Sequence, residues 1–318
     1  MRPQLHRALA WLGPFLGLLL VVTIFGILVP ESFLTFGNVR TIAAQTVIPA
    51  LGALGMTFVI GSGGIDLSAG SQVALASVVC AYGMRAGLGE MASCGLAIAT
   101  TAACGLVNGV LITLLRVVPF IVTLGMLGVA RGLAKWIANE QKIDAPAGWL
   151  SSVMAKVPDP AWLLLSPGVW LLLGLGLLLG LVLRRTTFGL HTIAIGSNEA
   201  TARLCGVPVG LRKIQLYTLL GALCGLAGCM LFGRLTVGDP TTAVGLELQV
   251  IAAVVIGGAS LSGGECSIPG ALIGAFVMSS LQSGCNQAGV PTYVQEIVIG
   301  VIIVTAVAID RFRGKLTG

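Results

Sequence analysis

Residues 8–29 read ALAWLGPFLGLLLVVTIFGILV, a run of 22 residues that contains no charged side chain. A helix that crosses the roughly 30 Å hydrocarbon core of a bilayer needs about 20 mostly apolar residues. The run follows Arg2 and Arg7, as in a signal peptide, but it is long and no small-residue cleavage site follows it. We therefore predict a retained first transmembrane helix.

The composition of the whole chain extends this prediction. Of the 318 residues, 56% are hydrophobic and 9% are charged, whereas soluble proteins carry about 25% charged residues. The mean hydropathy of +0.99 excludes a cytosolic enzyme, a disordered tail and a secreted disulfide scaffold. It indicates that much of the protein surface faces membrane lipid instead of water. The net charge of +6 does not indicate nucleic acid, because the basic residues lie in short clusters without interleaved aromatic side chains.

Nine further segments are apolar enough to be membrane helices. We predict an all-α fold, a polytopic integral membrane bundle of about ten transmembrane helices in a single domain over residues 1–318. Glycine-rich stretches at 61–70 and 257–270 predict broken or re-entrant segments, and they leave eight or nine crossings open. The nine segments are 42–60, 68–84, 91–115, 119–138, 161–183, 214–235, 247–261, 268–288 and 293–309.

Small residues are frequent within these segments. The 45 glycines favour a tightly packed bundle, or alternatively interfaces along which helices slide. The tripeptide SGG at 62–64 recurs at 262–264, and Gly70 recurs as Gly270. This echo is either chance or the trace of a parallel repeat of five helices.

Lysine and arginine are distributed unequally between the predicted loops. With ten crossings and the N-terminus inside, 11 of the 18 basic residues fall in inner segments. Cytoplasmic loops carry an excess of Lys and Arg, so we predict that both termini are cytoplasmic. The two long loops are then 139–160 on the periplasmic side and 184–213 on the cytoplasmic side.

Signatures of catalysis and of metal or nucleotide binding are absent from the sequence. It contains no GxxxxGK[ST], GxSxG or HExxH motif. The two histidines are 185 positions apart, and the eight cysteines form no CxxC pair and are interpreted as small packing residues. We therefore predict no enzyme, no catalytic residue, no metal site and no cofactor on this chain. Energy for uphill transport would come from another subunit or from an ion.

The stretch GSGGIDLSAG (61–70) places Asp66 among four glycines at membrane depth or its edge. A carboxylate at membrane depth costs about 2.5–3.5 kcal/mol on insertion scales, so it needs a partner or water. Asp66 or Ser68 caps the next helix, or the segment is a broken helix that lines a polar cavity. Both interpretations can hold together.

The segment PFIVTLGMLGVARGLAKWI (119–137) begins with a proline, which suits the first turn of a helix. Arg131 lies about 18 Å along this helix, past the membrane midplane. Its guanidinium either snorkels to the interface, as we expect for Lys135, or pairs with an acid, for which Glu247 is the candidate. Asn108 is a buried amide that more often bonds across helices than meets a substrate.

The inner segment SNEATARLCG (197–206) is predicted to form a short capped helix. Ser197 or Asn198 precedes Glu199, whose charge suits a helix N-terminus, and Gly206 with Pro208 stops the helix. The segment is either an ordinary positive loop that holds topology or a docking element for a cytoplasmic partner.

Four stretches carry a family resemblance: GMTFVIGSGGIDLSAGS (55–71), PFIVTLGMLGVARGLA (119–134), FGLHTIAIGSNEATARLCGV (188–207) and AVVIGGASLSGGECSIPGALIGA (253–275). The sequence resembles the permease of bacterial ATP-binding cassette (ABC) sugar importers of the ribose/xylose/arabinose/galactose type. The resemblance implies a multi-pass permease of the bacterial inner membrane that moves a monosaccharide, ribose or a similar pentose or hexose, by alternating access. It also implies a second permease copy or paralogue, a cytoplasmic ABC ATPase that binds ATP and Mg, and a periplasmic sugar-binding protein.

The resemblance also assigns roles to residues. Glu199 and Gly206 are one residue further apart than in other importer classes, and Cys266 stands where the family more usually has glycine. The implied coupling residues are Ser197, Asn198, Glu199, Ala200, Arg203 and Gly206, and the implied translocation-pathway residues are Gly63, Gly64, Asp66, Ser68, Asn108, Phe120, Thr123, Arg131 and Glu247.

The alternative function is a secondary transporter or facilitator of small polar solutes that works alone. Such a protein needs several polar groups clustered at one membrane-embedded site. In the sequence these groups are scattered, at Asp66, Asn108, Arg131, Glu247 and Glu296. The scatter favours a permease that depends on partner subunits.

Overall fold

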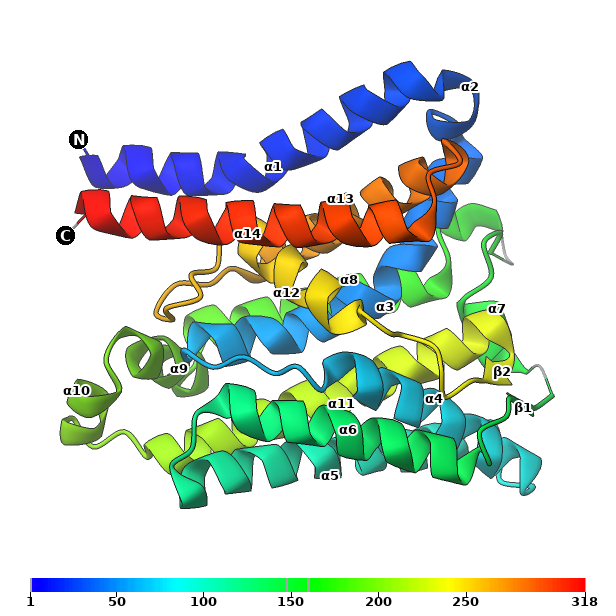
Figure 1. The fold of residues 1–318 in the computed structure, drawn as a ribbon, viewed down its shortest axis with the longest axis horizontal. Coiled ribbons are helices and arrows are strands. Elements are labelled where there is room, and N and C mark those ends of the chain that lie inside the picture. The colour runs from blue at the N-terminus through cyan, green and yellow to red at the C-terminus, as the bar shows by residue number, and fades with distance from the viewer. Residues whose placement is uncertain (1, 147, 159–160, 318) are drawn as a thin grey trace.

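A computed structural model describes residues 2–146, 148–158 and 161–317, and most of them are helical (Figure 1). The side chains of residues 1–12, 161, 306–307 and 309–318 lie outside this description, and with them the predicted inner charges Arg2, Arg7, Arg311, Arg313 and Lys315. The elements are α1 (Arg2–Leu28), α2 (Pro30–Phe33), α3 (Phe36–Gly61), α4 (Ala69–Arg85), α5 (Glu90–Leu115), α6 (Pro119–Ile137), β1 (Ile143–Asp144), α7 (Trp149–Val153), the 3-10 helix η1 (Ala161–Leu163), α8 (Pro167–Arg185), α9 (Thr187–Ser197), α10 (Glu199–Leu204), α11 (Val209–Leu235), β2 (Val237–Gly238), α12 (Leu246–Ile256), α13 (Ile268–Gln287) and α14 (Thr292–Thr317).

Each predicted membrane segment coincides with a helix, which confirms a polytopic helical bundle. Among the described residues, α3, α5, α6, α8, α11 and α13 are the 6 helices long and apolar enough to cross a membrane. Shorter apolar stretches occupy Gly13–Leu28, Leu246–Ile256 and Thr292–Thr305, and α4 has 17 residues. The total of ten crossings therefore stays a prediction.

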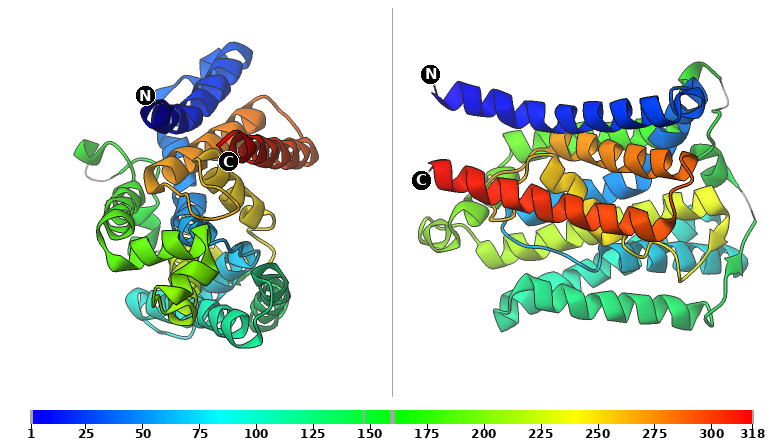
Figure 2. Two further views of the ribbon diagram at one scale, coloured as in Figure 1. Left: turned by 90° about the vertical axis from the view of Figure 1, so that its left-hand side faces the viewer. Right: turned by 45° about the horizontal axis from the view of Figure 1, so that its top comes forward.

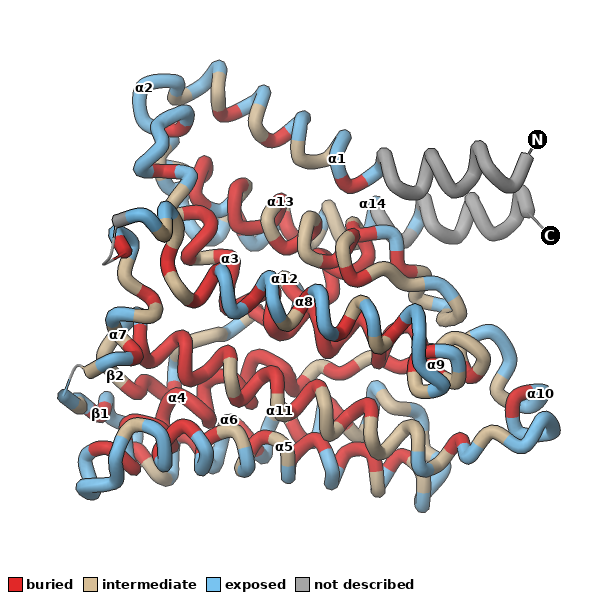
Figure 3. Tube along the Cα trace, turned by 180° about the vertical axis from the view of Figure 1, so that it is seen from behind, coloured by how far each residue is buried: buried red, intermediate tan, exposed pale blue. Residues whose placement is uncertain are grey.

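Helix α3 lies at the centre of the bundle, and other helices surround it. In its most apolar stretch 94% of the residues are buried, whereas 22% are buried in the corresponding stretch of α6. Figure 3 shows this gradient, with buried positions concentrated on the inner helices and exposed ones on α1, α5, α6 and α8. Exposed leucines on those outer helices suit contact with lipid.

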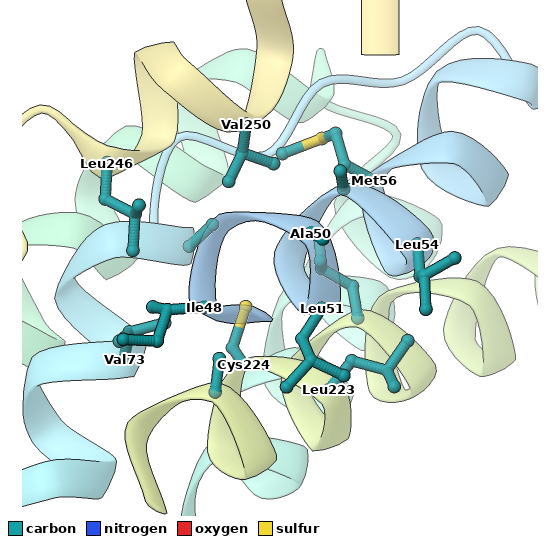
Figure 4. Packing of buried hydrophobic residues seen from close by; sticks show 14 of the residues in the cluster. Ile48, Ala50, Leu51, Leu54, Met56, Val73, Leu223, Cys224, Leu246 and Val250 are labelled. Atoms are coloured by element: carbon teal, nitrogen blue, oxygen red, sulfur yellow. The ribbon is translucent and has the colours of Figure 1, made fainter. Parts of the chain in front are cut away.

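The core around α3 is built from branched and small apolar side chains (Figure 4). Leu51 and Leu54 of α3 are fully buried, as are Val73 of α4 and Cys224 of α11, and Val250 of α12 packs over the same helix. Helices from both halves of the sequence thus close around one central helix.

Helices α5 and α11 approach closely along facing small residues. Gly105 and Gly109 of α5 lie four apart, as do Gly221 and Gly225 of α11. A Cβ added to Gly109 would lie 2.6 Å from Cα of Ile214, and one added to Gly225 would lie 2.6 Å from Cα of Ile98. The two GxxxG motifs therefore bring the backbones together, as small residues do between membrane helices.

The two ends of the bundle differ. Helices α9 and α10 lie at the same end as both chain termini, and α7, β1 and β2 lie at the other end (Figures 1 and 2). Strand β1 pairs antiparallel with β2, with Ile143 opposite Gly238, so the predicted loop 139–160 contains a short strand and helix α7. The exposed Trp136 and Trp162 next to this end are placed as interfacial aromatic residues are in membrane proteins.

Candidate functional site

Helix α10 is the predicted short helix at the end of the bundle that holds the termini. Asn198 is its N-cap, and Oδ1 of Asn198 accepts a hydrogen bond from the Thr201 N–H at 2.9 Å. At the other end Gly206 adopts φ +81°, and its N–H donates to the Arg203 carbonyl. The capped helix and its glycine stop are thus confirmed. Ser197 belongs to the end of α9, where its hydroxyl donates to the Ile193 carbonyl.

The Glu199 side chain is partly exposed and pairs with two cations. Arg203 Nη2 lies 2.9 Å from one carboxylate oxygen and Lys213 Nζ lies 2.6 Å from the other. Partial burial raises the pKa of the Glu199 carboxyl, but the hydrogen bonds and charges of Lys213 and Arg203 outweigh burial, so this pKa lies below its ordinary value. Because Lys213 is on α11, the pair ties α10 to the first turns of that long helix.

A cavity of about 490 Å³ opens beside this ion pair. Arg116, Arg203 and Lys213 contribute basic side chains to its wall, and Glu199 contributes the acid. The turn between α5 and α6 and the start of α11 form the other walls. Sequence reasoning assigned neither Arg116 nor Lys213 to the site, because the fold alone brings them to α10.

Leu204, the last residue of α10, is a second residue that sequence reasoning missed. Its side chain is 89% exposed, more than any other described large hydrophobic residue. The helix that carries it ends in the polar turn Cys205–Gly206 beyond the apolar spans. A single exposed apolar side chain is common on protein surfaces and does not by itself define an interface, so Leu204 is a candidate contact residue for a partner.

The end of α9 also joins the two glycine-rich stretches. The Gly264 N–H donates to the Gly61 carbonyl at 3.0 Å, and Gly196 fits between these segments with no room for a Cβ. A Cβ on Gly263 would lie 2.8 Å from the Gly63 nitrogen. Gly63 has φ +80° and Gly263 has φ +84°, in the left-handed region that favours glycine. The two SGG tripeptides therefore touch each other and contact the segment that leads into α10.

Asp66 lies at the centre of a buried hydrogen-bonded group, which we call the Asp66 cluster: Asp66, Ser68, Gln72 and Asn108. One carboxylate oxygen of Asp66 accepts the Ser68 N–H at 2.7 Å and the Ser68 hydroxyl at 2.5 Å, and the other accepts Asn108 Nδ2 at 3.2 Å. Gln72 Nε2 donates to the Ser68 hydroxyl at 2.7 Å. The cluster links the broken segment before α4 to α5.

The expected capping of α4 is realised differently. Ser68 occupies the N-cap position, but its side chain accepts no N–H of the helix. Asp66 satisfies the Ser68 N–H instead of an N–H within the first turn of α4, so the capping interpretation is wrong in its detail.

The assigned pathway residues occupy three different environments. Gly63 and Gly64 belong to the broken segment, Phe120 is exposed on α6, and Thr123 is buried with its hydroxyl near the Ile65 carbonyl. Asp66, Ser68 and Asn108 are fully buried. Their roles in a pathway stay predictions.

Arg131 does not form the expected ion pair with Glu247 among the described salt bridges. Its Nη1 donates to the carbonyls of Pro240 at 2.8 Å and Thr242 at 2.6 Å. Glu247 lies against Gly70 of α4, where one of its carboxylate oxygens is buried without a hydrogen-bond partner in the described part of the chain. Arg131 therefore fixes the loop that leads into α12. Lys135 is exposed, and its snorkelling to the interface stays a prediction.

Three cysteines from different helices converge in the core. The sulfur atoms of Cys80, Cys94 and Cys229 lie within 4.8 Å of one another. Sequence spacing concealed this group because α4, α5 and α11 each supply one member. Structural zinc sites normally use four ligands, and the described chain places no fourth ligand beside these thiols.

The fold and the site define a multi-pass helical membrane protein that presents a folded, tethered helix at one end. Residues 38–307 match the family described as "Branched-chain amino acid transport system / permease component". The chain belongs to this family of transport permeases, and the resemblance found in the sequence is confirmed.

The chain is similar to named permeases over nearly its whole length. It is 39% identical over 306 residues to the ribose import permease protein RbsC of Bacillus subtilis (strain 168), which covers 94% of this chain and 92% of the relative. It is 38% identical to RbsC of Escherichia coli (strain K12), with 95% of each chain covered. It is 36% identical to the L-arabinose ABC transporter permease protein AraH of Azospirillum brasilense, over 90% of this chain and 83% of the relative. No solved structure matches the chain.

Proposed function

We propose that the chain is the membrane-spanning permease of an ATP-driven importer that moves a monosaccharide into the cell. The observation that carries this proposal is the likeness, over nearly the whole chain, to permeases named for ribose and L-arabinose transport. The family description names branched-chain amino acids, but these individual relatives are named for sugars. The substrate is therefore a pentose or hexose.

ATP hydrolysis belongs to a separate subunit in this proposal. The sequence has no P-loop to hold ATP and Mg. Helix α10 carries the exposed Leu204, and its Arg203 lines a cavity together with Arg116 and Lys213. A cytoplasmic ABC ATPase docks on α10. Both chain ends lie at the end of the bundle that holds α10 (Figure 1), so both termini are cytoplasmic in the inner membrane.

The remaining partners follow from the same family. A second permease copy or a paralogue completes the pathway, and a periplasmic binding protein delivers the sugar to the end that holds β1 and β2. ATP binding moves the ATPase pair, and α10 transmits this motion because Glu199 fixes it to Lys213 of α11. The bundles then alternate between outward and inward access.

Reconstitution tests the proposal directly. The tagged chain is purified with its co-purifying subunits and placed in liposomes, and uptake of radiolabelled D-ribose, L-arabinose, D-allose and L-leucine is measured. We expect uptake of a monosaccharide that requires ATP, the ATPase and the binding protein. Uptake of the same sugar by the purified chain alone would show a stand-alone transporter or facilitator and refute the proposal.

A second experiment tests the docking helix. Leu204→Asp removes the exposed apolar side chain of α10, and Val157→Asp makes the same change at an exposed position near the opposite end. We expect the Leu204 variant to lose the co-purifying ATPase while it still inserts into the membrane, and the Val157 variant to retain it. Equal ATPase recovery with both variants would place the docking surface elsewhere.

A further inference from the structure

A second cavity, of about 390 Å³, lies between four helices away from α10. Its polar lining comes from Gln45 of α3, Arg234 of α11, Gln249 of α12, Gln282 and Asn286 of α13, and Thr242 of the loop before α12. Apolar side chains of α3, α11 and α12 complete the wall. We call this space the amide cavity. Its volume falls within the roughly 300–1,000 Å³ of small-molecule sites.

The polar groups of the amide cavity are mostly unpaired. Within the described chain, Gln45, Gln249, Gln282 and Arg234 make no side-chain hydrogen bond or ion pair. Gln45 lies about 14 Å from the start of α3, and α3 and α13 are both long enough to cross a membrane. Gln45 and Gln249 are half-buried, whereas Gln282 and Arg234 are exposed on the same cavity, and an unpaired amide that faces lipid is costly. Amides gathered in one cavity therefore indicate contact with water or with a polar solute.

The chemistry of the lining selects among solutes. Each carboxamide can both donate and accept hydrogen bonds, which matches a hydroxyl group that does the same. No carboxylate lines the cavity to pair with the ammonium group of an amino acid. The carboxamides and the Arg234 guanidinium can all donate to the oxygen atoms of a hydroxyl-rich molecule, with the apolar wall available to its C–H faces.

We propose that the amide cavity is a transit site for the monosaccharide, in which Gln45, Gln249 and Gln282 bind its hydroxyl groups. This inference rests on the proposed function and adds the place where sugar meets the permease. The site differs from the Asp66 cluster, whose carboxylate is buried and already bonded. Because the amides come from three helices, relative motion of those helices breaks the site and releases the sugar.

The test uses the whole complex, with the permease, ATPase and binding protein in liposomes. The double variant Gln249→Leu/Gln282→Leu removes two amides at nearly constant size. Gln141→Leu makes the same change at an exposed loop position as the matched control. Sugar uptake and ATP hydrolysis are measured together, with the monosaccharide that the wild-type complex transports as the probe.

We expect the double variant to take up sugar about 30-fold more slowly per ATP hydrolysed, because two neutral hydrogen bonds worth about 1 kcal/mol each are lost. The Gln141 variant should behave as wild type. Unchanged uptake by the double variant overturns the assignment of the amide cavity. Separation of the double variant from its second copy in size-exclusion chromatography also overturns it, because the loss of uptake would then come from a broken assembly and not from lost contacts with the sugar. Failure of the wild-type complex to transport any monosaccharide refutes the proposed function instead.

Discussion

Replacing Asp66 separates a structural role for the Asp66 cluster from a role in the pathway. Asp66→Ala removes the acceptor of the Ser68 N–H, the Ser68 hydroxyl and Asn108 Nδ2. Asp66→Asn keeps one carbonyl oxygen for Ser68 but turns an amide N–H toward Asn108. The two variants therefore break different numbers of hydrogen bonds at one fully buried position.

The expected loss of stability follows from the donors left unpaired. A buried donor without a partner costs about 1–3 kcal/mol. Asn108 Nδ2 still reaches the Ser68 hydroxyl at 3.2 Å in Asp66→Ala, so about two donors remain unsatisfied. We expect roughly 3–5 kcal/mol for Asp66→Ala and about 1–2 kcal/mol for Asp66→Asn, which loses one hydrogen bond.

The assay is the thermal stability of the purified permease in detergent, followed by size-exclusion chromatography after heating. At about 2 °C per kcal/mol, we expect the apparent Tm of Asp66→Ala to fall by roughly 6–10 °C. The apparent Tm of Asp66→Asn should lie between those of Asp66→Ala and wild type. The Tm of Glu296→Ala, a change at an exposed position, should equal that of wild type. If Asp66→Ala melts like wild type yet abolishes sugar uptake, the structural role is refuted and Asp66 acts in the pathway.

Three further predictions concern α10, the α5–α11 contact and the cysteines. The folded-state pKa of Glu199 lies below its ordinary 4.5, so its ion pairs stabilise the protein fully above about pH 4.5 and are lost as the pH falls further. Glu199→Gln should remove this part of the acid dependence of the Tm. An unchanged dependence of the Tm on pH would show that these ion pairs do not stabilise the fold. Gly225→Ala places a Cβ 2.6 Å from Cα of Ile98 and should cost about 1–3 kcal/mol, seen as a lower Tm, whereas Gly95→Ala, with open space around it, should not. A thiophilic chelator should leave the Tm of wild type and of Cys229→Ser unchanged, and a drop in wild type alone would show a bound metal ion.

The helices could be predicted from the sequence because lipid imposes a simple requirement on length and composition. Each apolar run of sufficient length became a helix, from 42–60 to 268–288. The short helix α9 and the strands β1 and β2 were not predicted, because they lie within predicted loops. Each two-residue strand also forms only by pairing with the other, which is distant in the sequence. The central position of α3 was not predicted either, although its apolar residues are spread around the helix more evenly than those of the lipid-facing α6, a distribution typical of a buried helix.

The candidate site likewise contains residues that the sequence identified and residues that only the fold brings together. Asn198 and Gly206 could be identified because a helix cap and a glycine stop are local signals within ten residues. The second partner of Glu199 could not be identified, because Lys213 lies fourteen residues further along the chain on another helix. The amide cavity was hidden for a similar reason, since its glutamines come from three helices and each looks isolated in the sequence.

Helix α11 joins the two ends of the proposed mechanism. Its Lys213 holds α10 near one end, and its Arg234 lines the amide cavity near the other, about 32 Å away at 1.5 Å per residue. The GxxxG contact locks α11 to α5, so these two helices move as one body. Gly61, Gly196 and Gly264 meet in a similarly close backbone contact, with the Gly264 N–H bonded to the Gly61 carbonyl. By the same reasoning we expect the end of α9 and the two glycine-rich stretches to move together, so that a displacement of α10 reaches both stretches.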